Sequence, residues 1–357
     1  MRRRLAQDRN SFTAALTTAR GEMRQRGWTF VATGATIATA MASSPLYGAI
    51  EAGGTKMVCG VGNAETGSRE TARIATGDVA TTTGEIAAFL AAARDRHGAL
   101  AGIGVASFGP LDLDPASPGF GRITTTPKPG WQGADLPAAL KAALGLPVAI
   151  DTDVNAAALA EARLGAARGR RSVAYVTVGT GIGVGLVIDG RMVHGLGHPE
   201  GGHLLPRRHP DHGDFAGTCP FHRDCLEGLA SGTAIHAAWG EPLDKLPADH
   251  AAWGIEADYL GQLCASLIFT VSPEHIVLGG GVMAQARLFD PIRAETGRRL
   301  AGYAALWDDA ALAARITPPG CVEPPGLTGA YLLAESVSTC STAGAAARCG
   351  VTSARHA

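Results

Sequence analysis

The chain has 357 residues, of which 46% are hydrophobic and 18% charged, and its formal net charge is −1. This length and composition predict a large core shared by two domains, with sparse aromatics that favour close helix–sheet packing over a wide aromatic recognition surface. The near-neutral charge excludes a nucleic-acid face beyond residue 46, because the excess of arginine lies before it.

Residues 1–45 are set apart from the remainder. Seven arginines stand there against Asp8 and Glu22. We interpret the segment as an upstream extension of the reading frame, with Met41 as the natural start. A disordered tail is the next alternative. A targeting signal is the last, because the apolar stretch 30–42 is diluted by Thr and Gly and stands far from the first arginines.

The first motif lies between two short apolar strands, 47–50 and 57–62. Glu51 ends the first strand, and the turn that follows is Gly53, Gly54, Thr55 and Lys56. Glycines let backbone N–H groups approach an anion, and a carboxylate at a strand end can hold Mg²⁺ directly or through water. The segment therefore predicts a hairpin that binds phosphate, although many glycine-rich hairpins only make a turn.

A buried strand at 103–107 leads toward a stiff loop, 124–131. This loop contains Thr126, Lys128 and Trp131. It is expected to border the sugar or the phosphates, and we place Thr126 among the nucleotide contacts. A proline-rich turn around a packed tryptophan explains the same residues.

The next strand, 147–150, ends at two carboxylates, Asp151 and Asp153, and a helix is predicted over 156–167. Ligands of α/β proteins gather where strands end. We predict Asp153 to be the general base for an attacking hydroxyl, with Asn155 orienting it or the acceptor. Helix capping by Asp or Asn is the simpler alternative.

Two further glycine turns follow. Strands at 172–178 and 184–188 enclose Gly179, Thr180 and Gly181, a second hairpin of the phosphate-binding kind. A long helix is predicted at 255–271 and a strand at 275–278, which leads into Gly279, Gly280 and Gly281. Together these motifs predict a two-lobed α/β protein with a nucleotide between its halves.

A compact Cys-x₂-His-x₂-Cys run with an upstream histidine predicts a metal site. The four ligands are His203, Cys219, His222 and Cys225. This mixture suits tetrahedral Zn²⁺, and four protein ligands indicate a structural role. A histidine-rich surface loop is the alternative, and His212 and Asp224 are possible substitutes for His203.

Two carboxylates flank this metal loop. Glu200 precedes it and Glu227 follows it. They are predicted to accept hydrogen bonds from vicinal sugar hydroxyls; the alternative is that both are solvated surface charges.

The seven cysteines do not predict a disulfide framework. Cys59 and Cys264 fall in apolar surroundings and are expected to be buried thiols. Three others lie in loop or tail segments: Cys321, Cys340 and Cys349. Reduced thiols favour the cytoplasm, and no membrane partner is expected.

These motifs, in this order, resemble the ROK family of sugar kinases and related repressors, and more closely its bacterial fructokinase branch. The resemblance covers about 46–335 and is carried by these segments: Glu-Ala-Gly-Gly-Thr-Lys (51–56), Thr-Pro-Lys-Pro-Gly-Trp (126–131), Asp-Thr-Asp-Val-Asn (151–155), Thr-Val-Gly-Thr-Gly-Ile-Gly (177–183), Pro-Glu-Gly-Gly-His (199–203), Cys-Pro-Phe-His-Arg-Asp-Cys-Leu-Glu-Gly (219–228) and Leu-Gly-Gly-Gly-Val (278–282).

The resemblance implies an actin-like, ribonuclease-H-like fold whose two lobes close on ATP and a hexose, with Mg²⁺ and Zn²⁺ as cofactors. Asp153 matches the family's catalytic aspartate, and Glu200 and His203 match its sugar-and-zinc motif. Gly280 and Gly281 match its adenosine contact. Family members are often dimers, so a homodimer is a possible assembly.

The implied activity is phosphorylation of D-fructose to fructose 6-phosphate. Many glucokinases of the family have Asp at the position of Glu51 and a Cys-x-Cys-Gly-x₂-Gly-Cys zinc loop. The histidine in the loop of this chain favours fructose. A broader hexokinase acting on mannose or glucose is the alternative, and a non-catalytic sugar-responsive repressor is a distant one.

The predicted lobes are 46–154, completed by a helix near 326–336, and 155–325, which contains the metal loop 203–225. A disordered tail is expected over 337–357.

Overall fold

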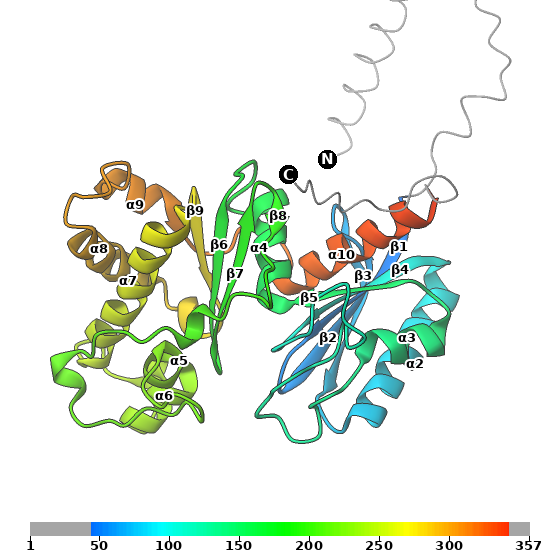
Figure 1. Cartoon of the computed structure of the whole chain (residues 1–357), viewed down its shortest axis with the longest axis horizontal. Helices are drawn as coiled ribbons and strands as arrows, with labels where there is room; N and C mark the ends of the chain where they lie inside the picture. Colours follow the sequence, from blue (N-terminus) through cyan, green and yellow to red (C-terminus); the bar gives the residue numbers. More distant parts are fainter. Residues whose placement is uncertain (1–43, 343–357) are drawn as a thin grey trace, which may run out of the picture. The chain divides into compact units, whose positions relative to one another are not determined.

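The computed structural model describes residues 44–342 (Figure 1). Most of the predicted extension 1–45 and the end of the predicted tail therefore lie outside the described residues. The helices and strands described below belong to the unit that begins at Pro45.

This unit contains two mixed five-stranded sheets. The first has the order β3-β2-β1-β4-β5 and the second the order β10-β9-β6-β7-β8. The strands of the first sheet are β1 (Leu46–Ala52), β2 (Lys56–Asn63), β3 (Gly67–Ala75), β4 (Leu100–Ser107) and β5 (Val148–Thr152). Those of the second are β6 (Val173–Val178), β7 (Ile182–Ile188), β8 (Arg191–Met192), β9 (His275–Gly279) and β10 (Ile316–Thr317).

The two sheets share one topology. In each, a central strand (β1 or β6) pairs antiparallel with the next strand and parallel with a later one. The outer strands continue both patterns. The turns at Gly53–Thr55 and Gly179–Gly181 therefore occupy equivalent positions in the two sheets. Sequence similarity between the halves does not reveal this repeat.

Helices cover both faces of each sheet (Figure 1). They are α2 (Val79–His97), α3 (Leu136–Leu144), α4 (Asp153–Arg163), α5 (Leu226–Ala230), α6 (Gly232–Trp239), α7 (Ala252–Val271), α8 (Phe289–Leu300), α9 (Asp309–Arg315) and α10 (Pro325–Thr342). α2 and α3 share a core with one face of the first sheet, and α5, α7 and α8 share a larger core with one face of the second. The other faces meet α10 and α4, respectively.

α4 is the element that joins the two halves. Ala156 belongs to the core beneath α10, whereas Val154 and Ala157 pack under β6 and β7. The approach is so close that a side chain at Gly185 of β7 or Gly329 of α10 would collide with the α4 backbone. Small residues at these contacts let one helix serve both sheets.

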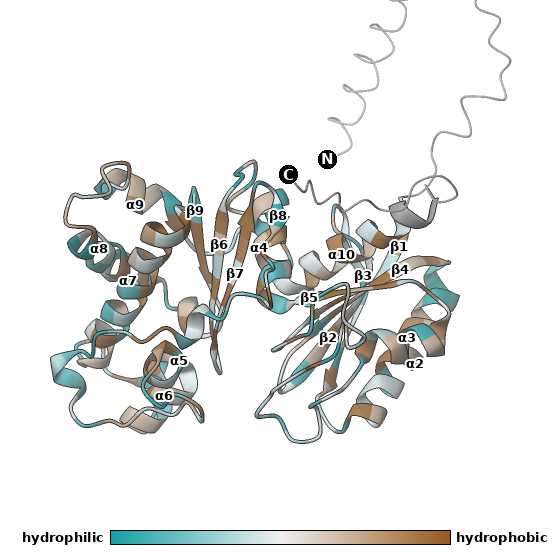
Figure 2. Cartoon of the chain, in the orientation of Figure 1, coloured by the Kyte–Doolittle hydropathy of each residue, from teal (hydrophilic) through white to brown (hydrophobic). Residues whose placement is uncertain are grey.

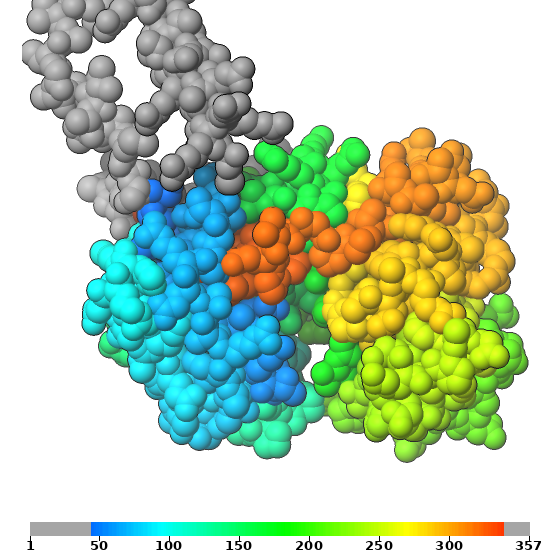
Figure 3. Space-filling model, turned by 180° about the vertical axis from the view of Figure 1, so that it is seen from behind, coloured from blue at the N-terminus to red at the C-terminus, as the bar shows by residue number. Residues whose placement is uncertain are grey.

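Hydropathy follows this layering: the sheet strands are mostly apolar, while much of the solvent-facing surface of α8 is hydrophilic (Figure 2). The space-filling view shows a hollow between the first-sheet side (blue) and the yellow-green side of the second sheet (Figure 3). The α/β fold and its cleft are as predicted. Within 44–342, no helix is both long and apolar enough to span a membrane.

Two predicted boundaries were wrong. The helix predicted over 156–167 begins at Asp153, because Thr152 caps its start by accepting a hydrogen bond from the Asn155 amide. It ends at Arg163. The chain then turns through Gly165 and Gly169. At the other end, α10 continues to Thr342, past the predicted start of the tail at 337.

Candidate active site

The turn between β1 and β2 presents an exposed, glycine-bearing backbone. The Gly53 N–H donates to the Lys56 carbonyl at 3.0 Å, which closes the turn. Gly54, Thr55 and Lys56 are exposed. No atom lies within 4 Å of a side chain placed at Gly54, so the space beside this turn is open to a ligand.

The predicted loop 124–131 is hydrogen-bonded to this turn. Lys128 Nζ donates to the Gly54 carbonyl at 2.5 Å and to the Thr76 carbonyl at 3.2 Å. The half-buried Thr126 accepts from the Lys128 amide at 3.3 Å. Trp131 is completely buried, donates to the Gly77 carbonyl and packs edge-on against Phe108. The loop thus contains both a packed tryptophan and a lysine that supports the first glycine turn.

The second glycine turn, between β6 and β7, is supported from the start of α6. The Gly232 amide donates to the Gly179 carbonyl at 2.7 Å, and Thr233 Oγ1 donates to the Thr180 carbonyl at 2.8 Å. Gly179 itself donates to the Gly181 carbonyl. Thr180 remains exposed at the tip.

Glu227 lies directly behind this turn. Its Oε2 accepts from the Ile182 amide at 3.1 Å, and any side chain at Gly181 would collide with it. The alternative of a solvated surface charge was therefore wrong. Instead, Glu227 supports the second glycine turn from the first turn of α5.

The third glycine turn borders a cavity of about 520 Å³. Gly280 has a φ of +90°, and a side chain there would collide with Val178. Gly281 is exposed, with open space around it. The cavity wall is formed by Gly279, Gly280, Met283, Ala284, Ala286, Phe289, Asp290, Arg293, Pro318 and Pro319. Most of the lining is apolar, and its two charged groups, Arg293 and Asp290, are paired with each other at 2.8 Å, which suits a flat heterocycle.

Asp153 is half-buried in the first turn of α4. Its Oδ1 accepts from the Val154 amide at 2.9 Å. Burial and, secondarily, the nearby carboxylates of Glu51 and Glu200 together raise the pKa of Asp153 to about 7, although the hydrogen bond from Val154 lowers it. A carboxylate with a pKa near neutrality is well suited to accept a proton in catalysis.

Glu51 is the penultimate residue of β1 and is half-buried. Burial raises its pKa, and the Lys56 ammonium opposes the shift. Because Glu51 and Asp153 repel one another electrostatically, the pair favours a cation between or beside them. Carboxylate oxygens of this kind fit Mg²⁺.

Asp151 and Asn155 form a buried network behind Asp153. Asp151 accepts from Asn155 Nδ2 at 3.0 Å and lies 2.8 Å from His194 Nε2. Asn155 Oδ1 accepts from the Leu186 amide of β7 at 3.1 Å, and the residue has no exposed surface. Its amide is thus used within the protein, so we assign it a positioning role in place of the predicted substrate contact.

The loop that contains Glu200 and His203, here called the Glu200 loop, contacts the segment after β4 through the nearby His198. His198 Nε2 accepts from the Leu111 amide at 2.9 Å, and its Nδ1 lies 3.5 Å from Glu200 Oε1. Burial, with Glu227 nearby, raises the pKa of Glu200 to about 7. Glu200 remains 44% exposed, so its carboxylate is accessible to a ligand.

His198 supports a prediction. Truncation of His198 to alanine leaves the buried Leu111 amide without its acceptor, which costs about 1–3 kcal/mol. We expect the KM for the sugar to rise by roughly tenfold or more while the KM for the nucleotide changes little. Initial-rate kinetics with each substrate varied measure this. His236→Ala, at an exposed position of α6, is the control; equal effects of both variants contradict the assignment.

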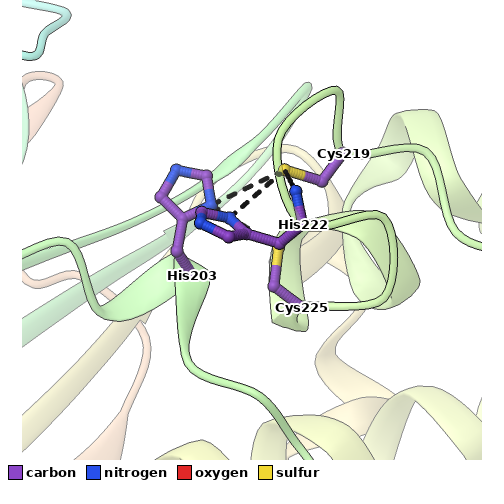
Figure 4. Close-up of side chains that lie close together, drawn as sticks. All are labelled: His203, Cys219, His222 and Cys225. Atoms are coloured by element: carbon purple, nitrogen blue, oxygen red, sulfur yellow. Dashed lines mark hydrogen bonds between the residues drawn. The ribbon is translucent and has the colours of Figure 1, made fainter.

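The four predicted metal ligands converge (Figure 4). One donor atom from each of His203, Cys219, His222 and Cys225 lies within 4.8 Å of the others. His203 Nδ1 is 3.5 Å from Cys225 Sγ and 3.8 Å from Cys219 Sγ. Tetrahedral zinc with nitrogen and sulfur ligands separates such atoms by roughly 3.6 Å, so the set fits Zn²⁺.

The two substitute ligands lie outside this cluster. His212 is buried, and its Nδ1 lies 2.8 Å from the Tyr259 hydroxyl, with the ring stacked on Phe215. Asp224 lies 3.6 Å from Arg208. His203 is therefore the residue that completes the set.

Several residues of the site escaped the sequence analysis. His194, His198 and Arg293 carry no motif of their own, and each works through a contact with a distant segment. The histidine-rich character of 194–212 was the one available signal, and it did not distinguish ligands from positioning residues.

The fold and this site define a two-lobed α/β protein with three glycine turns and a carboxylate base candidate. Residues 47–337 match the ROK family, and the chain belongs to it.

Among relatives, it is 44% identical to the fructokinase of Zymomonas mobilis over 292 residues, 81% of this chain and 96% of that protein. Among solved structures, a ROK hexokinase from Thermus thermophilus is similar with a TM-score of 0.67 and 28% identity, over 82% of this chain and 99% of that one. A ROK glucokinase from Streptomyces griseus, in complex with glucose and AMPPNP, has a TM-score of 0.63 and 25% identity over the same shares.

Proposed function

We propose that this protein is an ATP-dependent fructokinase that converts D-fructose to fructose 6-phosphate. The observation that carries the proposal is the position of Asp153, a carboxylate with a pKa near 7 that is electrostatically coupled to both Glu51 and Glu200. Similarity to a fructokinase along nearly its whole length supports the choice of sugar.

The sugar hydroxyl is the nucleophile in this reaction. As the bond from its oxygen to the γ-phosphorus forms, its proton passes to the Asp153 carboxylate and the bond from the γ-phosphorus to the bridging oxygen breaks, which releases ADP. The transition state of phosphoryl transfer is loose, so positioning and charge neutralisation contribute most of the rate. Glu200 holds the sugar, and the Gly53–Lys56 and Gly179–Gly181 backbones hold the phosphates.

The nucleotide base is assigned to the cavity beside Gly280, with Phe289 and Met283 as apolar wall and Arg293 at its edge. Thr126, Lys56 and Gly281 remain secondary candidates for nucleotide contacts. Mg²⁺ at Glu51 would supply charge neutralisation on the phosphates when bound.

Zinc is assigned to the cluster of two histidines and two cysteines. Four protein ligands leave no open position, so its chemistry is structural: it would fix the loop that follows Glu200. The side chains of five of the seven cysteines are described, and none of these five is in a disulfide, which supports a reducing compartment such as the cytoplasm.

An assay of ADP release across sugars tests the proposal. We expect turnover with D-fructose to exceed that with D-mannose, D-glucose and N-acetylated hexoses. Equal turnover of glucose and fructose would favour the broader hexokinase. No ADP release with any hexose would contradict a kinase altogether.

The two carboxyl groups with a pKa near 7 predict a pH profile. Asp153 accepts a proton only when ionised, so kcat/KM should rise as the pH increases through about 7 and level off above it. Because Asp153 and Glu200 interact, the acid limb reflects both. In Glu200→Gln we expect the limb to become shallower but to persist. A value of kcat/KM that stays constant from roughly pH 5.5 to roughly pH 8, a range that brackets the pKa of Asp153, contradicts the assignment.

A further inference from the structure

Glu161 is a buried carboxylate that the proposed mechanism does not use. It lies in the last turn of α4 and has no exposed surface. Its Oε2 accepts from the Ala166 amide at 2.6 Å and from the Gly320 amide at 2.9 Å, and its Oε1 accepts from the Cys321 amide at 3.2 Å. Three backbone donors thus surround one buried carboxylate, an arrangement of strong hydrogen bonds that is costly to disturb.

The packing around Glu161 leaves no room for adjustment. A side chain at Gly165 would collide with the Glu161 carboxylate, and one at Gly320 would collide with Ala166. Two segments far apart in the sequence therefore close over the same side chain.

The second of these segments forms part of the cavity wall. Pro318 and Pro319, which line the cavity, immediately precede Gly320. Gly279, which also lines the cavity, packs against this segment, since a side chain there would lie 3.1 Å from Pro319. At the other end of the segment, Arg293 donates from both Nε and Nη2 to the Ile316 carbonyl. The segment 316–321 is thus fixed by Arg293 at its start and by Glu161 at its end.

The same helix carries Asp153. The eight residue steps from Asp153 to Glu161 span about 12 Å along the helix axis. We infer that Glu161 is a positioning residue that fixes the 318–319 wall of the nucleotide cavity relative to the helix bearing Asp153, so that nucleotide and base share one rigid frame. The inference rests on the proposed function, which places the nucleotide in this cavity.

Two variants of Glu161 test it in the full chain. Glu161→Ala removes all three acceptor contacts, whereas Glu161→Gln keeps one oxygen. We expect the Kd for MgADP, measured by calorimetry without sugar, to rise about tenfold or more in Glu161→Ala and by less in Glu161→Gln. The KM for ATP should follow, while the KM for fructose stays within about twofold.

Glu323→Gln is the matched control. Glu323 also lies between β10 and α10 and accepts from the Ser68 amide of β3 at 3.0 Å, but it is not among the residues that line the cavity. It should leave the Kd for MgADP unchanged. If the Glu161 variants bind MgADP as tightly as the original chain, or if nucleotide and sugar constants change alike, the role is merely structural and the inference is overturned. If Glu161→Ala does not fold, Glu161→Gln decides.

Failure of the proposed function gives a different result. A chain that binds MgADP but does not phosphorylate fructose loses the fructokinase assignment, and the Glu161 comparison still decides the inference. A chain that does not bind MgADP at all overturns both.

Discussion

Replacement of Asp153 by asparagine is expected to lower kcat for fructose phosphorylation by roughly 10²–10⁴-fold, the usual contribution of a general base. Asparagine keeps the size of the side chain and can still accept a hydrogen bond from the Val154 amide, as Asp153 Oδ1 does at 2.9 Å. It cannot accept the proton of the sugar hydroxyl. The effect should therefore fall on kcat, while the Kd for MgADP stays within a few-fold.

The control for Asp153→Asn is Asp189→Asn. Asp189 is an exposed carboxylate in the turn between β7 and β8, with a φ of +51° that asparagine tolerates. It should retain nearly full activity. Single-turnover measurement of ADP formation separates the chemical step from product release. An Asp153→Asn enzyme with a tenth of the original rate would reject the base assignment.

Features that depend on a few consecutive residues could be predicted from the sequence. The glycine turns at 53–55 and 179–181 follow from glycine flanked by apolar strands, and the structure contains both hairpins. The metal ligands Cys219, His222 and Cys225 follow from their spacing. His203 was the least certain of the four ligands, because His198, His209 and His212 lie in the same stretch of sequence.

Features that depend on distant contacts could not be predicted in this way. The amide side chain of Asn155 could bind a substrate, yet it is buried and bonded to the Leu186 amide of β7, 31 positions away in the sequence. The contact from His198 to Leu111 spans 87 positions and that from Glu161 to Gly320 spans 159. A local pattern contains no information on which distant amide a side chain will meet.

The shared topology of the two sheets shows the same limit. The two equivalent turns read Gly-Gly-Thr and Gly-Thr-Gly, and the strands around them share only an apolar character. A buried strand needs apolar side chains of suitable volume, and many different sequences meet that requirement. The two sheets therefore share the pattern of strand pairing but not the residues that support their turns: Lys128 supports the first turn and Glu227 the second.

Loss of one metal ligand is the second change expected to have a large effect. In Cys219→Ser the set of two thiolates and two histidines loses the sulfur that lies 3.7 Å from His222 Nδ1 and 3.8 Å from His203 Nδ1. We expect the bound zinc to fall from about one per chain to a small fraction, because structural zinc is held by its full ligand set. Metal analysis of the purified protein by mass spectrometry measures this directly.

The loss should also affect sugar binding. His203 lies three residues after Glu200, and the Leu226 amide that follows Cys225 donates to the Leu204 carbonyl, so the metal cluster and the Glu200 loop are one structural unit. Without zinc, the backbone hydrogen bond from Leu226 to Leu204 and weak contacts of the two thiols with His203 are left to hold this unit together. The KM for fructose should therefore rise by about tenfold or more, with a smaller change in the Kd for MgADP.

Cys321→Ser is the control for this variant, since Cys321 is a half-buried thiol outside the cluster. It should retain both zinc and the KM for fructose. Removal of zinc from the original chain with a strong chelator should reproduce the Cys219→Ser kinetics, and readdition of Zn²⁺ should restore the chelated protein but not the variant. Full activity in a protein shown to be free of zinc would mean that the four side chains hold the Glu200 loop without a metal.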